Sequence, residues 1–321
     1  MALTLAQIQN LAIEWGVPDS PTIIADLIKR SGILQTAIVR KASHGIKHKY
    51  KIFNELPSAT FRNIGGGIVP VAISKTRASI DLWNAVMLLE ADYKDVEENL
   101  GSKAGWETAN SPAAVEGFGQ TIAKQIIYGT DPTFGSTNGF LGFHQYAKAN
   151  SKVVKQMGGA SASNSTLFAV RWDENDGASI RVGSQNNIVN IRDLTPASPV
   201  TSVTNTTTNE KDLVYQWLID GFLSLIIPSA TSVAAITQID LTHAPTVTDI
   251  NNLVDAVDTG TGQVYLYCNN VVRNLIYNLK DGKLKLVPVD TEYNTQVLNW
   301  NGMAPLVLDQ NLSRVETSVL D

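Results

Sequence analysis

Residues 56–70 of this 321-residue chain read LPSATFRNIGGGIVP, a triple glycine between two prolines. Upstream, residues 44–53 alternate between polar and apolar side chains as a strand does, and residues 78–93 can form the return strand. Because glycine adopts backbone conformations closed to other residues, the stretch predicts a flexible hairpin tip at Gly65–Gly67. A phosphate-binding loop is the alternative, but neither Gly-Lys-Ser/Thr nor a helix start follows the glycines. A two-stranded hairpin is only marginally stable in water, so we expect it to lie against another surface, such as another chain.

A helix with a clear start signal follows the hairpin. Asn110-Ser111-Pro112 combines a capping residue with a proline at the first helical position, and Gly129 provides the stop. Apolar side chains at helical spacing give residues 112–128 one buried face. The middle of the chain is expected to be β-rich, with short strands over residues 166–172, 178–183 and 188–194. Residues 200–208 are β-branched and polar, and residues 213–227 are expected to form a long strand or a pair of strands.

The last third of the chain reads as helix, strand, helix and three more strands. We expect the first helix to be capped by Thr248 and ended by Gly260 and Gly262. The second helix is expected to be capped by Asn269 or Asn270 and closed by Asp281-Gly282. The strands are expected over residues 263–268, 284–289, 297–300 and 305–308. Together the segments predict an α+β fold.

The first 54 residues combine two short helices with a basic segment. Amphipathic helices are predicted over residues 5–16 and from Ser20-Pro21 onward, and neither is long enough to be stable without a partner surface. Between Lys29 and Asn54 there are seven basic residues and no acid, whereas five acids gather within residues 90–98. Solvated faces are the simpler explanation for such runs. The alternative is charge complementarity between neighbouring subunits, which fixes their register.

Composition and motif searches exclude several function classes. The net charge of −5 argues against a protein that grips DNA phosphates. The single cysteine, Cys268, cannot form an internal disulfide and is expected to be an inert core thiol. His44 and His48 can share a strand face, but no third metal ligand lies nearby in sequence. Residues 173–177 (DENDG) lack the final glutamate of a calcium loop and are expected to form a turn. No catalytic motif, cofactor motif or membrane-spanning apolar stretch of about 18 residues is found.

Several short segments, in the same order along nearly the whole chain, resemble the major capsid proteins of tailed bacteriophages, which have the Hong Kong 97-like fold. The resemblance is carried by stretches distributed from the hairpin tip to the C-terminus: Ala59-Thr60-Phe61-Arg62, Ile127-Tyr128-Gly129-Thr130-Asp131-Pro132, Phe140-Leu141-Gly142, Phe168–Trp172 with Ile180–Ser184 as paired strands, Tyr267–Arg273 and Gly302–Asp309. No single stretch is diagnostic. Their shared order is the evidence.

The resemblance implies a division of the chain into four parts. These are an N-terminal arm (residues 1–40), an extended E-loop hairpin (41–93), a peripheral domain with a spine helix over 112–128 (94–239), and an axial domain (240–321) whose C-terminal end can return to the peripheral domain. In this fold the peripheral strands usually follow a different order along the chain, so the borders in the middle stay open. No helical scaffolding segment precedes the arm in this sequence, which favours a separate scaffolding protein.

The resemblance also implies a structural function and no enzymatic activity. We expect pentamers and hexamers that form an icosahedral capsid around double-stranded DNA, without sequence-specific DNA binding and without a membrane. The expected partners are other copies of the chain, a scaffolding protein, a portal and a decoration protein, with assembly in the bacterial host cytoplasm and residence in the virion. An encapsulin-like nanocompartment shell is one alternative, and a β-rich carbohydrate-active enzyme or tail fibre protein is the other.

The candidate subunit contacts combine arm, hairpin and acidic-cluster residues. They are Trp15, Arg40, Lys47, Lys49, Phe61, Arg62, Gly65, Gly66, Gly67, Lys75, Arg77, Asp95, Glu97 and Glu98. No catalytic, cofactor-binding or metal-binding residue is proposed from the sequence.

Overall fold

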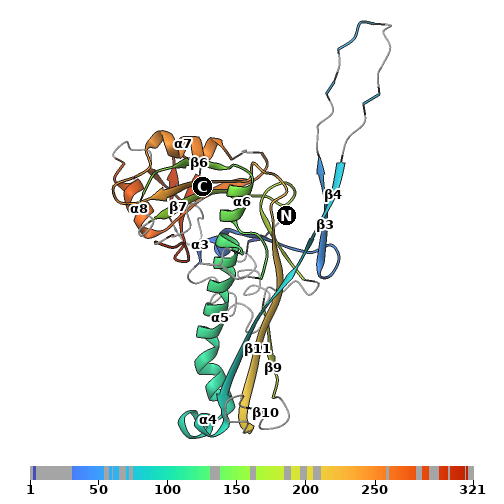
Figure 1. The fold of residues 1–321 in the computed structure, drawn as a ribbon, viewed down its shortest axis with the longest axis vertical. Coiled ribbons are helices and arrows are strands. Elements are labelled where there is room, and N and C mark those ends of the chain that lie inside the picture. The colour runs from blue at the N-terminus through green and yellow to red at the C-terminus, as the bar shows by residue number, and fades with distance from the viewer. Residues whose placement is uncertain are drawn as a thin grey trace.

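The computed structural model describes residues 3–4, 31–53, 58–59, 61–64, 70–71, 75–130, 138–159, 164–183, 189–195, 201–204, 211–257, 260–279, 284–288, 296–302, 304–314 and 316. These residues form two large sheets, a separate two-stranded hairpin and a long helix that runs along one of the sheets (Figure 1). The predicted α+β class is confirmed. The amphipathic helices predicted within residues 5–28 and the glycines at 65–67 lie outside the described residues.

The hairpin consists of β3 (Lys47–Phe53) and β4 (Lys75–Asp81), paired antiparallel. Among the described residues no third strand joins them, and the hairpin projects from the body of the molecule (Figure 1). The prediction of one return strand over residues 78–93 is wrong. Leu82 is buried and its N–H donates to the Ile46 carbonyl at 2.8 Å, after which the chain enters the first large sheet as β5 (Trp83–Asp92). The return strand divides there because the apolar side chains of β5 pair with a long strand of that sheet.

The first sheet is built on that long strand, β11 (Lys211–Ile226), so of the two possibilities expected over residues 213–227 the single long strand is confirmed. β5 pairs with β11 antiparallel from Asp92 opposite Val214 to Trp83 opposite Leu223. Alternate side chains of β11, including Trp217 and Ile219, are buried on the face toward the long helix. The remaining strands of this sheet are β1 (Leu3–Thr4), β2 (Ile38–Lys41), β8 (Ser179–Val182), β9 (Asn190–Asp193) and β10 (Thr201–Thr204).

The long helix α5 (Lys103–Tyr128) begins earlier than predicted. Ser102 is its N-cap and accepts a hydrogen bond from the Gly105 N–H at 3.2 Å, so Pro112 lies inside the helix instead of at its start. A proline there removes one backbone hydrogen bond and costs about 3 kcal/mol relative to alanine. The apolar face, which runs from Trp106 to Ile126, offsets this cost by burial against the first sheet. Gly129 ends the helix at φ +64°, as predicted.

The second sheet carries seven strands with β7 near its middle, in the order β14-β15-β16-β13-β7-β12-β6. Every residue of β7 (Ser165–Trp172) is buried, because both of its faces are covered. Phe168 and Trp172 face the core shared with α5, whereas Leu167 and Ala169 face a second core. The other strands are β6 (Val153–Gln156), β12 (Val233–Ile239), β13 (Gln263–Cys268), β14 (Leu284–Pro288), β15 (Gln296–Trp300) and β16 (Ala304–Leu308). The strands predicted over 263–268 and in the last 40 residues are confirmed.

Shorter helices complete the structure, and their caps correct two predictions. They are α3 (Gly32–Thr36), α4 (Tyr93–Leu100), α6 (Phe143–Ala149), α7 (Val247–Asp255) and α8 (Asn270–Tyr277). Thr246, not Thr248, caps α7, because its hydroxyl accepts from the Asp249 N–H while the Asp249 carboxylate accepts from Thr246. α7 ends at Asp255, before Gly260 and Gly262. Asn269 caps α8, which ends at Tyr277, before Asp281-Gly282.

The strands β7 and β8 do not pair with each other, contrary to the resemblance-based expectation. β7 belongs to the second sheet and β8 to the first, so the turn over residues 173–177 carries the chain between the sheets. The Asp173 carboxylate accepts from the N–H groups of Asn175 and Asp176 at 3.0 and 3.2 Å, which makes it a turn former. β12 and β13 both pair with β7, so the sheet of the last third also includes strands from the middle of the chain.

Candidate subunit interface

One face of the hairpin is strongly basic. In an antiparallel pair, residues directly opposite each other share a face, and the register places Lys47 opposite Asp81, Lys49 opposite Ser79 and Lys51 opposite Arg77. All of these side chains are exposed. Lys47 lies 3.1 Å from Asp81, an exposed pair of little energetic weight. We call Lys47, Lys49, Lys51 and Arg77 the basic face. Lys75, also predicted to be a contact, lies in β4 opposite Phe53.

The opposite face of the hairpin is half-buried and turns toward the body. His48 and Tyr50 stack with ring centroids 6.1 Å apart. Burial lowers the pKa of His48, and the nearby charges of Arg181 and His44 lower it further. The imidazole is therefore neutral near pH 7, and its Nδ1 accepts a hydrogen bond from the Ser43 N–H at 3.2 Å. This arrangement leaves the basic face pointing away from the rest of the chain.

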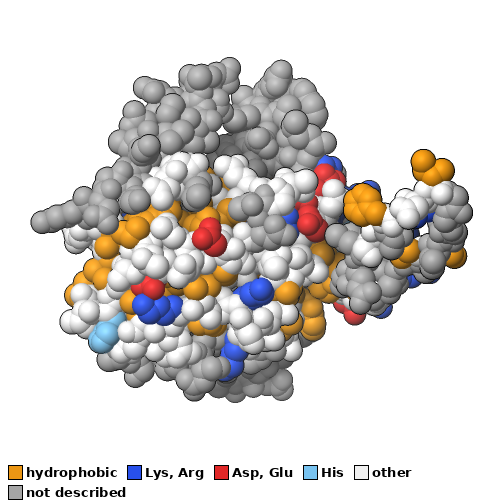
Figure 2. Space-filling view, turned by 90° about the horizontal axis from the view of Figure 1, so that it is seen from above, with side chains coloured by type: hydrophobic (Ala, Val, Ile, Leu, Met, Phe, Trp, Pro, Cys, Tyr) orange, Lys and Arg blue, Asp and Glu red, His pale blue; other side chains and the backbone are white. Residues whose placement is uncertain are grey.

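The described part of the hairpin tip exposes apolar side chains. Phe61 and Ile64 are fully exposed, and Val71 is 56% exposed. Figure 2 shows hydrophobic side chains on the hairpin, where it stands clear of the body. Arg62 lies between these residues, and the predicted contacts Gly65–Gly67 lie outside the described residues. Large apolar side chains in this position have no cover within the described part of the chain, which is typical of an interaction surface.

The acidic cluster lies at the opposite end of the molecule from the hairpin (Figure 1). Asp92 caps α4 by accepting from the N–H groups of Lys94 and Asp95, while Asp95 accepts from the Asn99 amide at 2.6 Å. Glu97 and Glu98 follow on the same short helix. All these carboxylates are exposed. We call Glu90, Asp92, Asp95, Glu97 and Glu98 the acidic cluster. The structure therefore separates the two charge runs instead of pairing them within one chain.

The remaining predicted contacts fall into different surroundings. Arg40 in β2 donates to the Glu174 carboxylate at 2.6 Å, so part of its charge is neutralised inside the chain. Trp15 lies outside the described residues. The structure thus groups the hairpin lysines with Arg77, and Asp95 with Glu97 and Glu98, but it does not bring the two groups together.

Sequence reasoning missed an apolar outer face on the β5–β11 pair. Val86 and Leu88 are 56% and 46% exposed, and the register places Leu88 opposite Leu218, which is also partly exposed. The signal was present, because residues 85–89 form a continuous apolar run, typical of a strand covered on both faces. Among the described residues, the covered side of β5 is the side that faces α5, where Ala85, Met87 and Leu89 pack on the core. The outer face is a further candidate contact surface.

Possible chemistry elsewhere in the described residues is limited. No group of three or more His, Cys, Asp or Glu side chains among them could hold a metal ion. A cavity lined by Asn269, Asp309 and Arg314 contains polar groups engaged in structural hydrogen bonds: Asn269 caps α8, and Asp309 holds the start of α3. Cys268 is buried, as predicted, and burial raises the pKa of its thiol to about 12. None of the described helices is both long and apolar enough to span a membrane.

Comparison with known protein families shows which kind of protein carries these surfaces. The family model of major capsid protein GP7 matches residues 18–319, nearly the whole chain. The chain belongs to the major capsid protein GP7 family. It is therefore a structural protein of a tailed-phage virion that forms the capsid. The exposed hairpin and the separated charge clusters are surfaces of a capsid subunit.

Solved structures confirm the fold of this capsid protein. It is similar to the bacteriophage Epsilon15 structure, with 16% identity, a TM-score of 0.58 and 88% of each chain covered. It is also similar to the bacteriophage JBD30 capsid, with 12% identity, a TM-score of 0.53, and 94% and 98% of the two chains covered. No curated protein matches the sequence. The predicted Hong Kong 97-like fold is confirmed, and no finding favours the encapsulin-like shell, the carbohydrate-active enzyme or the tail fibre protein.

Proposed function

We propose that this capsid protein assembles as pentamers and hexamers into an icosahedral shell around double-stranded DNA. The observation that carries the proposal is the projecting two-stranded hairpin, which exposes Phe61 and Ile64 and has no third strand among the described residues. A two-stranded hairpin is marginally stable by itself, so packing of its exposed face on another chain would stabilise it. Head-to-tail contacts of this kind close into rings, and several weak contacts per subunit together make a stable shell.

The proposed division of the subunit starts from the predicted borders, with one change for the strands β7 and β12. Residues 1–40 form the arm, 41–93 the E-loop hairpin, 94–239 the peripheral domain and 240–321 the axial domain. The separate β3–β4 sheet supports the hairpin as a unit of its own. The pairing of β7 with both β12 and β13 argues for counting β7 and β12 with the axial strands.

The proposed partners beyond the subunit itself are a separate scaffolding protein, a portal and a decoration protein. Assembly is proposed to take place in the host cytoplasm. We also propose that the chain has no catalytic activity. The structural roles of Asn269 and Asp309 in the polar cavity described above support this, because neither side chain is free to act on a substrate.

Within the shell, we propose that the basic face of one hairpin docks on the acidic cluster of a neighbouring subunit. Two observations support the pairing: the surfaces carry opposite charges, and they lie at opposite ends of one chain (Figure 1). The basic face and the acidic cluster of one chain therefore do not meet each other, whereas those of head-to-tail neighbours can. Phe61 and Arg62 at the tip, and Gly65–Gly67 beyond them, are proposed to extend this contact, and Trp15 of the arm is proposed to be a separate one.

Charge reversal tests this docking. Lys49→Glu with Lys51→Glu should reduce the yield of closed shells, since like charges would then face each other. Adding Glu97→Lys and Glu98→Lys should restore assembly. Lys124→Glu, which reverses an exposed lysine on α5 outside both clusters, is the matched control and should assemble normally. Loss of assembly without rescue by the second pair of changes would exclude this pairing of surfaces.

Electron microscopy of the purified chain, with and without a candidate scaffolding protein, tests the assembly proposal itself. Closed shells or capsomer rings are expected. A monodisperse monomer under both conditions would refute it. A proline at each of positions 65–67 should also hinder assembly, because the tip could no longer adapt to non-identical positions in the lattice. Normal particles from that variant would show that tip flexibility is not required.

A further inference from the structure

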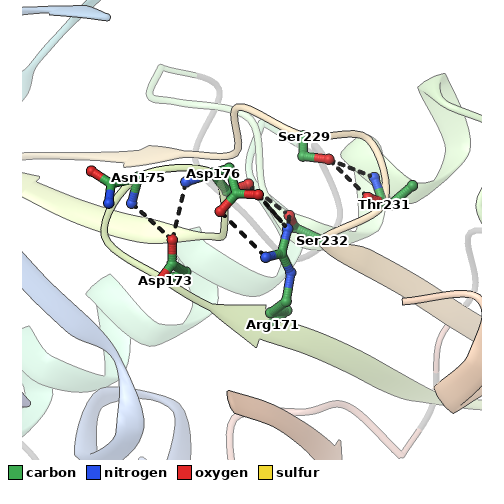
Figure 3. A network of polar contacts seen from close by, with 7 residues as sticks. All are labelled: Arg171, Asp173, Asn175, Asp176, Ser229, Thr231 and Ser232. Carbon is green, nitrogen blue, oxygen red and sulfur yellow. Dashed lines mark hydrogen bonds and ion pairs between the residues drawn. The ribbon is translucent and has the colours of Figure 1, made fainter. Parts of the chain in front are cut away.

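Arg171 is a buried arginine at the point where the chain passes between the two sheets. Two loops carry the chain directly from a strand of one sheet to a strand of the other: residues 173–178 join β7 to β8, and residues 227–232 join β11 to β12. The Arg171 side chain is 0% exposed, whereas the Asp176 side chain that faces it is 57% exposed. Figure 3 shows the guanidinium reaching from β7 toward Asp176 in the first loop and Ser232 in the second.

The guanidinium binds both loops at once. Its Nη1 donates to Asp176 Oδ1 at 3.3 Å, and its Nη2 lies 3.3 Å from both Asp176 Oδ2 and Ser232 Oγ. Ser232 Oγ in turn donates to the Asp176 carbonyl at 3.0 Å, which joins the loops directly (Figure 3). The backbone of Arg171 repeats the connection, because its N–H donates to the Ser232 carbonyl and its carbonyl accepts from the Ala178 N–H, both at 2.8 Å.

Each loop also holds its own shape, so the arginine binds preformed turns. Asp173 accepts two backbone N–H groups of the first turn, and Ser229 Oγ lies 2.8 Å from Thr231 Oγ1 in the second. A third segment closes over the arginine: a Cβ on Gly260 would lie 2.9 Å from Nη1, and one on Gly262 would lie 2.8 Å from Cγ. The glycines predicted to end α7 therefore allow the backbone to approach Arg171 closely.

A buried charge is an unusual means of stabilising the place where the two loops pass between the sheets, because apolar side chains could fill the same space. Arg171 follows Leu167 and Ala169 in the alternation of β7, so its side chain leaves the strand on the side of the second core. Well-packed apolar side chains often stabilise such a place at least as well as a buried charge, so stability alone does not account for Arg171. A planar guanidinium with several donors fixes the positions of two loops more strictly than an apolar contact does.

We propose that Arg171 is a positioning residue that fixes the angle between the two sheets and so sets the subunit shape that gives shells of uniform size. The inference rests on the proposed shell assembly. Loss of the Arg171–Asp176–Ser232 side-chain contacts lets the sheets vary in orientation while each sheet stays folded, because these contacts tie β7 to the two connecting loops and are not part of the ladder of either sheet.

The test compares Asp176→Asn with Asp193→Asn. The control removes the ion pair of Asp193 with Lys103, which joins β9 to α5 on the same sheet and bridges no crossing. Electron microscopy is carried out at temperatures where both variants are equally folded. Asp176→Asn should give shells of mixed diameter or open sheets, whereas Asp193→Asn should give shells like those of the parent chain. Shells of uniform parental diameter from Asp176→Asn would overturn the proposal.

A second measurement does not depend on assembly. Spin labels at Ala109→Cys on α5 and at Leu241→Cys beyond β12 report the distance between the first sheet with its helix and the second sheet. Both positions are exposed and can be labelled, whereas the native Cys268 is buried. Asp176→Asn should broaden the distance distribution, and Asp193→Asn should not. If Asp176→Asn fails to fold, Ser232→Ala replaces it, because this variant keeps the ion pair and the backbone bond and removes only the side-chain hydrogen bonds of Ser232 to Arg171 and Asp176. An unbroadened distribution in the folded variant overturns the role of Arg171. A parent chain that forms no shells refutes the proposed function instead, and the label distances still decide the role of Arg171.

Discussion

Asp309 joins the N-terminal end of α3 to the segment after β16 through a single buried carboxylate. Its oxygens accept from Ser31 Oγ at 2.8 Å, the Ile33 N–H at 2.9 Å, and the N–H and side-chain amide of Asn311 at 2.8 and 3.0 Å. Burial raises the pKa of Asp309, although these hydrogen bonds act in the opposite direction. The start of α3, which lies within the predicted arm, is thereby fixed to the C-terminal segment.

Asp309→Ala should destabilise the free subunit by roughly 3 kcal/mol, because several buried donors would lose their acceptor. Urea unfolding followed by circular dichroism measures the change. Asp81→Ala, which removes only the exposed partner of Lys47, is the control and should cost less than about 1 kcal/mol. Equal losses in the two variants would mean that the Asp309 hydrogen bonds add nothing beyond a surface pair.

Asp249 should contribute part of the free energy of unfolding at neutral pH and lose this contribution at acid pH. Burial raises the pKa of Asp249, but the hydrogen bonds from Lys155 and Thr246 outweigh burial and leave it below its ordinary value. A depressed folded-state pKa means that the stabilisation is present above the unfolded value of about 3.9 and is lost as the pH falls through the folded value. The gap in unfolding midpoint between the parent and Asp249→Asn should therefore be largest at neutral pH and shrink below about pH 4. A gap that does not change with pH would contradict this assignment.

At the scale of elements, local sequence signals predicted which helices and strands exist better than they predicted where each one begins and ends. The strands over 213–227 and 263–268 follow from alternation and length. The start of α5 does not, because the strong Ser111-Pro112 signal competes with Ser102, and only the burial of Trp106 against the first sheet decides between them. α6 has no side-chain cap and was missed. Which sheet receives β7 or β8 depends on pairings between residues far apart in the chain, which periodicity cannot supply.

Pro112→Ala should stabilise the subunit. Pro112 is exposed on α5 and lacks the N–H that would complete the helical ladder, so alanine restores a hydrogen bond without disturbing the core. Proline also stiffens the unfolded chain, which reduces the gain to about 1–2 kcal/mol. Thermal unfolding of the two proteins measures it. A lower midpoint in the variant would show that the buried face of α5 requires the helix geometry that Pro112 imposes.

At the scale of the whole molecule, the sequence predicted the charged segments of the candidate contacts but not their positions relative to each other. The sequence contains the basic and acidic segments, yet nothing local shows that they lie at opposite ends of the folded chain. Nor could it show that Arg40 is bound to Glu174, 134 residues away. These facts depend on the packing of both sheets. The subunit therefore has two closed hydrophobic cores, whereas the hairpin tip and the outer face of β5 expose apolar side chains that contacts with other copies would cover.

Amide hydrogen exchange should reveal this division directly. Among the described residues, the strands of the β3–β4 hairpin pair only with each other and the tip exposes apolar side chains, so the hairpin amides of the free subunit should exchange quickly. β7, buried on both faces between β12 and β13, should exchange only on global unfolding. Assembly should slow the exchange of the hairpin by orders of magnitude and leave β7 nearly unchanged, because shell contacts cover the hairpin and add little to a core that is already closed. Rapid hairpin exchange in closed shells would mean that the hairpin does not lie on a neighbouring subunit, and the proposed docking on the acidic cluster would then fail with it.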